Sequence, residues 1–276
     1  MVTLNPKRAT LSPSELGFPH AETLSFSTSD GVRLKGWFVP SRGDRVIVLV
    51  HGIYSYAWDC QTPDVARAYR DADFNVFLFD SRGQGESGGT LGLGWFERHD
   101  LHAAVNVLLA RGFKLGRIGV HGTSYGAATA LLAAPEIPAI GAIVADSAFV
   151  DVRDVMLGEF ARRTGVSLGS TRLLAPGLRF IAQVHYAVNL HEVSPEKVIA
   201  AIAPRPVLLI HGERDPIIPV ESVGRLHRAA PNNTSVWVLP GRQHNEGVRL
   251  APDCEKESPL REEFLLKVTE FFRRNL

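Results

Sequence analysis

The sequence predicts a three-layer α/β domain in which helices cover both faces of a mostly parallel, eight-stranded sheet. The first observation is a series of continuously apolar, β-branched runs from residue 45 onward, which is typical of strands buried on both faces. The runs are RVIVLV (45–50), FNVFLF (74–79), RIGVH (117–121), IGAIVA (140–145), PVLLI (206–210) and SVWVL (235–239). The second observation is that helical patterns separate these runs, so right-handed βαβ crossovers and parallel strands are expected.

Two further strands are expected before residue 45. At 24–40 the sequence LSFSTSDGVRLKGWFVP has two alternating runs around the turn pair Asp30-Gly31, which predicts an antiparallel hairpin at the sheet edge. Helices are expected at 64–71, 94–111, 125–134, 220–229 and 259–274, and the last has one apolar face.

A long segment, 149–202, interrupts the alternation. Its stretches 153–163 and 173–186 are amphipathic, and long inserts in compact domains are usually lids or binding loops. Because no repeat or linker composition is present, we expect residues 1–276 to form a single domain with a lid at about 149–202.

Composition favours a small, neutral partner. The net charge is +1, from 30 basic and 29 acidic residues, so no global field would attract nucleic acid. No stretch is long and apolar enough to span a membrane, and the N-terminal MVTLNPKRATLSPSELGF has no apolar signal segment. Cys60 and Cys254 lack the spacing of a metal or redox site, so we expect both to be free thiols. We expect a cytoplasmic protein, and the sequence does not indicate its oligomeric state.

The motif Gly122-Thr123-Ser124-Tyr125-Gly126 lies between a predicted strand and a predicted helix. A sharp strand-to-helix turn lifts the serine hydroxyl above the sheet, and flanking glycines avoid collisions there. The helix N-terminus below it favours developing negative charge. This context predicts Ser124 to be a catalytic nucleophile.

A serine nucleophile needs a histidine base and a carboxylate that orients it. Among the ten histidines, His244 directly follows a predicted strand and comes after Ser124. Asp215 in HGERDPIIP is the expected acid, because Pro216 and Pro219 stiffen its loop. Asp146, which follows IGAIVA, is the alternative acid, although a structural hydrogen bond is its more expected role.

Two backbone donors are expected to stabilise the oxyanion. One is the N–H of Tyr125, and the other is the N–H of Ile53 in the loop His51-Gly52-Ile53-Tyr54, with that of Tyr54 as the alternative. The hydroxyl of Tyr54 is also a candidate substrate contact.

These motifs together resemble the α/β-hydrolase superfamily, and within it the esterases and serine aminopeptidase-like hydrolases with a single-glycine HG loop. The resemblance covers TSDGVRLKGWFVP, VLVHG, FLFDSRGQGESGG, HGTSYG, VADSAF, HGERDPIIP and GRQH. It implies the α/β-hydrolase fold, hydrolysis through an acyl-enzyme, and no cofactor. It also implies that residues 80–87 brace the oxyanion loop. The chain departs from the lipase pattern because it lacks the HGGG run.

Apolar residues of the insert suggest a hydrophobic pocket, although packing of the lid on the core would explain them equally. They include Met156, Leu157, Phe160, Leu173, Leu174 and Phe180, of which Met156 and Phe160 are the candidate substrate contacts. We expect esters of small to medium acyl chain as substrates and no metal site. Aminopeptidase, amidase and thioesterase activity remain alternatives. For an aminopeptidase, Glu159 and Glu192 are the candidates to bind a free amino terminus. A further alternative is a ligand receptor that keeps a slow catalytic triad.

Overall fold

The computed structural model describes residues 12–251 and 254–276. Its strands form one eight-stranded sheet in the order β1-β2-β4-β3-β5-β6-β7-β8. β1 pairs antiparallel with β2 and β2 antiparallel with β4, whereas all other neighbours are parallel. The predicted edge hairpin and parallel sheet are therefore confirmed. The strands are β1 (Glu22–Ser27), β2 (Arg33–Val39), β3 (Arg45–Val50), β4 (Phe74–Phe79), β5 (Ile118–Thr123), β6 (Ile140–Asp146), β7 (Val207–Gly212) and β8 (Thr234–Leu239).

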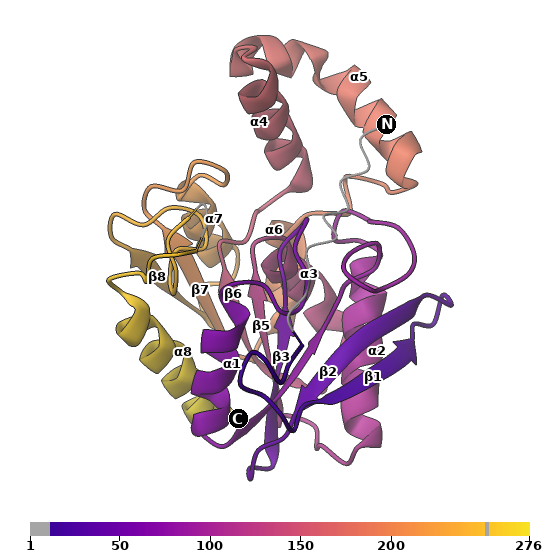
Figure 1. Cartoon of the computed structure of the whole chain (residues 1–276). Helices are drawn as coiled ribbons and strands as arrows, with labels where there is room; N and C mark the ends of the chain where they lie inside the picture. Colours follow the sequence, from indigo (N-terminus) through magenta and orange to yellow (C-terminus); the bar gives the residue numbers. More distant parts are fainter. Residues whose placement is uncertain (1–11, 252–253) are drawn as a thin grey trace.

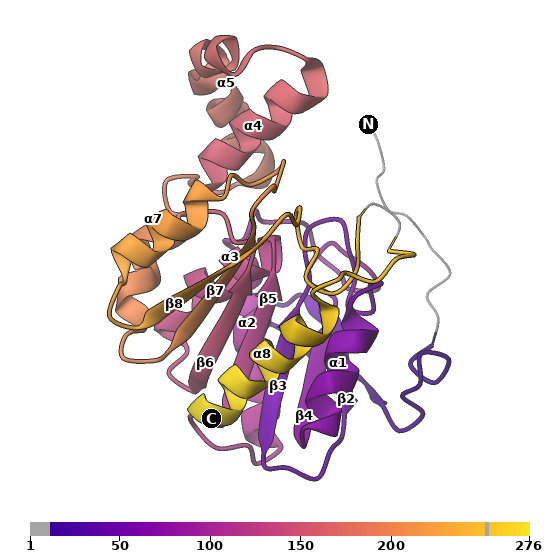
Figure 2. The same ribbon diagram turned by 90° about the vertical axis from the view of Figure 1, so that its left-hand side faces the viewer.

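Helices cover both faces of this sheet (Figures 1 and 2). The apolar side chains of α1 and α8 pack with alternate strand residues such as Ile47 and Leu49. Those of α2, α3 and α7 pack on the opposite face, against residues such as Val46 and Val48. The helices are α1 (Thr62–Asp71), α2 (Glu97–Ala110), α3 (Tyr125–Ala133), α4 (Val152–Thr164), α5 (Leu168–Tyr186), α6 (Pro195–Val198), α7 (Glu221–Ala229) and α8 (Arg261–Asn275), with short 3₁₀ turns η1 (Ala134–Glu136) and η2 (Ile199–Ile202).

The edge strand β8 departs from the expected burial. Val236 and Val238 are 40% and 37% exposed, whereas every residue of β4 is buried. These two residues point to the same face, which the helices cover incompletely at this edge, so the apolar run at 235–239 did not indicate burial on both faces there. Trp237, which points to the other face, stacks on Phe264 of α8.

The insert 149–202 contributes α4 and α5, which project beyond the carboxyl ends of the parallel strands (Figure 1). α5 begins earlier than its amphipathic pattern indicated, because Ser167 caps it by accepting a hydrogen bond from the Ser170 N–H. Leu173, Phe180 and Val184 of α5 are 84%, 69% and 67% exposed. Their side chains therefore face away from the core. The single-domain boundary and the lid role of this insert stay predictions.

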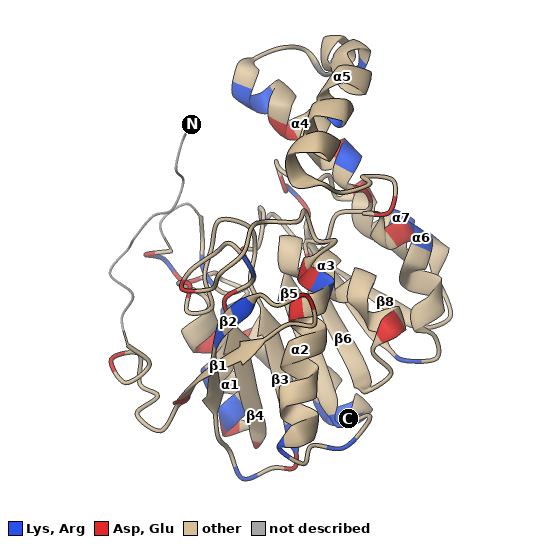
Figure 3. Ribbon diagram, turned by 90° about the vertical axis from the view of Figure 1, so that its right-hand side faces the viewer, with Lys and Arg blue, Asp and Glu red and all other residues tan. Residues whose placement is uncertain are grey.

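Charged residues of both signs are interspersed in the view of Figure 3. Among the described helices, none is long and apolar enough to cross a bilayer. Residues 1–11, which carry most of the N-terminal stretch searched for a signal segment, lie outside the described residues.

The expectation of free thiols is wrong, because Cys60 and Cys254 form a disulfide with a Cα–Cα separation of 6.1 Å. The two residues are 194 positions apart, so only the tertiary fold brings them together and their spacing gives no signal. The bond joins the segment before α1 to the segment before α8.

A cross-link between such distant residues restricts the unfolded chain strongly. We therefore expect the double variant Cys60→Ala/Cys254→Ala to lose about 2–5 kcal/mol of unfolding free energy. Denaturant unfolding measures this loss, and wild-type protein treated with a thiol reductant should fall to the stability of the variant. Equal stability of the variant and the oxidised wild type would contradict the cross-link.

Candidate active site

Ser124 lies in the turn between β5 and α3, where its backbone adopts φ 53° and ψ −116°. Positive φ is strained for a residue other than glycine, so the surrounding structure must hold the turn in place. The Ser124 N–H donates to the carbonyl oxygen of Asp146 at 2.7 Å. A Cβ at Gly126 would overlap the Val50 carbonyl of β3, and one at Gly122 would overlap the backbone of Gly126. Both glycines are therefore required for the close approach of the helix to the sheet.

The structure brings Ser124, His244 and Asp215 together. The hydroxyl Oγ of Ser124 lies 2.8 Å from His244 Nε2, and His244 Nδ1 lies 2.6 Å from Asp215 Oδ2. The other oxygen of Asp215 accepts hydrogen bonds from the N–H groups of Ile217 and Ile218, at 2.8 and 2.9 Å. The Asp215 side chain is fully buried, so its orientation is fixed before any substrate binds.

Asp146 lies close to this triad but makes a different contact. Its Oδ1 accepts a hydrogen bond from the Ser147 hydroxyl at 3.0 Å, and among the described contacts it makes none with His244. Burial raises the pKa of the Asp146 carboxyl to about 7, against the opposing effects of the Ser147 hydrogen bond and of His244. The geometry thus favours Asp215 as the group that orients His244.

The two expected oxyanion donors lie on either side of Ser124. Tyr125 is the first residue of α3, and Ile53 follows β3 in the neighbouring loop. A Cβ at Gly52 would lie 3.5 Å from the Ser124 Cβ, which shows how closely this loop approaches the serine. In the described chain, neither the Ile53 nor the Tyr125 N–H donates to another group, so both are free to bind an oxyanion.

The loop at 80–87 braces the oxyanion loop, as the resemblance implied. The Ser81 N–H donates to His51 Nε2 at 3.0 Å, so the ring carries its proton on Nδ1, which donates to the Gly52 carbonyl at 2.7 Å. Asp80 accepts from the Ala57 N–H at 2.7 Å and from the Glu86 N–H at 2.8 Å.

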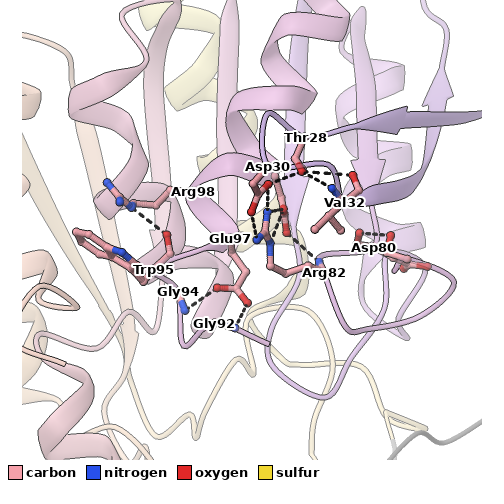
Figure 4. A network of polar contacts seen from close by, with 12 residues as sticks. Thr28, Asp30, Val32, Asp80, Arg82, Gly92, Gly94, Trp95, Glu97 and Arg98 are labelled. Atoms are coloured by element: carbon pink, nitrogen blue, oxygen red, sulfur yellow. Dashed lines mark hydrogen bonds and ion pairs between the residues drawn. The ribbon is translucent and has the colours of Figure 1, made fainter. Parts of the chain in front are cut away.

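Arg82 anchors this bracing loop to the rest of the fold (Figure 4). Its guanidinium pairs with Asp30 of the β1–β2 turn and with Asp100 of α2, at 2.7 Å each. The Asp100 side chain is fully buried, and its second oxygen accepts the Arg82 backbone N–H at 2.8 Å. Glu97, one turn before Asp100, accepts from the N–H groups of Gly92 and Gly94. These roles of Asp100 and Glu97 were not predicted from the sequence. The signal in the sequence was the presence of two acidic residues on the otherwise apolar face of α2.

A cavity of about 720 Å³ opens above Ser124. The predicted contacts Tyr54, Met156 and Phe160 line it, as do Ser124 and His244 and the two expected oxyanion donors, Ile53 and Tyr125. Leu173, Leu174 and Phe180 do not line the cavity, because they are exposed on α5.

Within residues 12–251 and 254–276 no group of three His, Cys, Asp or Glu side chains is arranged to hold a metal ion.

The sheet order, the nucleophile turn and the hydrogen-bonded residues above it are those of an α/β hydrolase. The sequence model of the family "Serine aminopeptidase, S33" matches residues 41–197, more than half of the chain, and the protein therefore belongs to this family of α/β hydrolases.

The chain is also similar to three known proteins. The chain is 32% identical over 221 residues to the uncharacterized protein YqkD of Bacillus subtilis, covering 78% of this chain and 70% of YqkD. It is 27% identical to the human serine hydrolase BPHL, covering 81% and 80% of the two chains. Among solved structures, the Pyrococcus furiosus esterase Pf2001 superposes with a TM-score of 0.73 at 26% identity, covering 98% of this chain and 97% of that one.

The raised pKa of Asp146 predicts a pH-dependent stability. The carboxyl ionises near 3.8 in the unfolded chain and at about 7 in the fold, so the folded protein binds this proton more tightly. Unfolding free energy is therefore lost as the pH rises from about 4 to about 7, by an amount on the order of a few kcal/mol.

Asp146→Asn removes this loss while keeping an acceptor for Ser147. We expect the melting temperature of the variant, relative to wild type, to be higher at pH 8 than at pH 5. Thermal denaturation at both pH values measures the difference, and parallel pH profiles for the two proteins would show that Asp146 does not titrate in this range.

Proposed function

We propose that this protein is a serine hydrolase that cleaves carboxylic esters of small to medium acyl chain through a covalent acyl-enzyme. The observation that carries the proposal is the hydrogen-bonded series Ser124, His244 and Asp215, of which Ser124 and His244 line a cavity whose surface is mostly apolar. The similarity to the P. furiosus esterase at 26% identity supports ester substrates.

In the proposed mechanism His244 Nε2 takes the proton of Ser124 as its Oγ attacks the ester carbonyl. Asp215 stabilises the imidazolium that forms, and the amides of Ile53 and Tyr125 bind the oxyanion. His244 then gives its proton to the leaving alcohol, and the acyl group remains on Ser124. A water molecule, activated by the same histidine, releases the acid and restores the serine.

The size of the cavity favours the stated chain lengths. A volume of about 720 Å³ is typical of sites for small molecules, and α4 contributes apolar side chains such as Val155, Met156 and Phe160 to its wall. Long-chain triglycerides exceed this volume, so we expect them to be poor substrates.

Peptide or amide cleavage is the second candidate, because the family description names aminopeptidases. The contacts of Glu159 weaken this candidate, since both of its oxygens accept hydrogen bonds from Arg162, and one also accepts from Arg163. Glu192 is exposed and does not line the cavity. Neither carboxylate is thus free within the cavity to bind an amino terminus. Thioester cleavage would use the same site.

A cytoplasmic location stays a prediction. The Cys60–Cys254 disulfide weighs against it, because most cytosolic thiols are kept reduced.

Hydrolysis of p-nitrophenyl esters from acetate to palmitate tests the proposal. We expect wild-type turnover to be highest for short and medium chains and to disappear in Ser124→Ala. Activity that rises steadily to palmitate would refute the chain-length assignment. No turnover by folded wild type would refute esterase activity, and a single-turnover covalent adduct would then favour a receptor.

The two acidic residues beside His244 should differ strongly in their effect. Asp215→Asn should lower kcat by about 10⁴, because the histidine loses the group that fixes its tautomer. Asp146→Asn is the matched control and should lower kcat far less, since Asp146 does not contact the ring. Steady-state kinetics on p-nitrophenyl butyrate compares them, and the reverse ranking would overturn the assignment of the acid.

A further inference from the structure

The cavity has a second part that the proposed mechanism does not use. Beyond the residues of α4, it extends between α1, α8 and the sheet. We call this part the α1/α8 chamber. It is lined by Thr62, Val65, His121, Asn245, Val248 and Phe264.

His121 is a buried polar residue in this chamber. The side chain lies on β5, three positions before Ser124, and the residue is only 2% exposed. Its ring packs against those of Tyr69 and Phe264, and its Nδ1 lies 2.8 Å from the Tyr69 hydroxyl. Its Nε2 is buried and has no partner in the described chain. A buried polar atom without a partner carries a substantial energetic cost, so a group that binds there is favoured.

The contact with Tyr69 determines whether Nε2 of His121 is a hydrogen-bond donor or an acceptor. Among the described contacts, the Tyr69 hydroxyl has no other partner, so it donates its proton to Nδ1 and the ring carries its own proton on Nε2. Burial lowers the pKa of His121 to about 3 and raises that of Tyr69, so both stay neutral at pH 7. Nε2 is therefore a hydrogen-bond donor at neutral pH.

Asn245 adds an acceptor to the same chamber. Its backbone is fixed next to His244, because its carbonyl accepts from Gln61 Nε2 at 2.7 Å and its N–H donates to the Ser147 hydroxyl at 3.4 Å. Its side-chain Oδ1 is buried without a partner in the described chain. Donor and acceptor together suit a group that can both accept and donate, namely a hydroxyl or an amide.

The mechanism indicates which part of an ester would reach these residues. The leaving oxygen must lie near His244 Nε2 to receive its proton, so the alcohol part lies on the side of Ser124 where His244 stands. Asn245 of the chamber directly follows His244, and Val248 lies four positions after it. The apolar residues of α4, such as Val155, Met156 and Phe160, remain to contact the acyl part.

We propose that the α1/α8 chamber holds the alcohol part of the ester, and that His121 and Asn245 select alcohols that carry a hydroxyl or amide group. This inference rests on the proposed esterase function and narrows its substrate class to esters of polar alcohols.

The test compares butyrate esters of ω-hydroxyalkyl alcohols with esters in which a methyl group replaces the terminal hydroxyl. The readout is the ratio of kcat/KM for the hydroxyl ester to that for its methyl counterpart, at several alcohol lengths. We expect wild type to favour the hydroxyl ester about five- to tenfold or more at one length, and His121→Phe to bring that ratio close to one. A purely structural role of His121 would lower both rates and leave the ratio unchanged.

Two further variants keep the result decisive. His102→Gln removes an exposed histidine from α2 and should leave both rates and their ratio unchanged. Asn245→Gly suits the positive φ of 55° at this position and should also lower the ratio, even if His121→Phe does not fold. A wild-type ratio near one at every length, with p-nitrophenyl esters still cleaved, would overturn this inference alone. Loss of all ester cleavage would instead refute the proposed function.

Discussion

The turn at Ser124 holds a backbone conformation that costs a residue other than glycine about 1–3 kcal/mol. The cost is met by contacts from the two strands that flank β5. The Asp146 carbonyl at the end of β6 accepts the Ser124 N–H, and the Val50 carbonyl of β3 lies so close to α3 that only glycine fits at position 126. The parallel register of β3, β5 and β6 therefore positions the serine, and the oxyanion loop after β3 reaches it for the same reason.

A second layer of polar contacts holds the loops around that turn. Asp80 and Ser81 bind the loop after β3, and Arg82 joins them to Asp30 at the surface and to the buried Asp100. Charged groups inside a protein are stable only when they are paired and hydrogen-bonded, and the Arg82 network meets this condition. The loops above the sheet are thereby fixed, which in the proposed mechanism lowers the reorganisation needed when charge develops on a substrate.

The fold followed from the sequence because its signals are local. Apolar runs of strand length and helical spacing between them determine the layers, and the strand-end rule singled out Ser124, Asp215 and His244, which the structure brings together. Features that depend on distant residues could not be predicted. The Cys60–Cys254 bond spans 194 positions, and the pairing of Tyr69 with His121 joins α1 to β5. The apolar pattern of α5 likewise did not show which of its residues would stay in solvent.

The order of the residues along the chain has a consequence for synthesis. Ser124 precedes His244 by 120 positions, and β7, α7 and β8 must form before the histidine can approach it. Domains are synthesised from the N-terminus, so the strained turn leaves the ribosome long before its partner exists. In a nascent chain Ser124 therefore has no histidine partner, and its hydrogen bond to His244 can form only after the last strand has docked on the sheet.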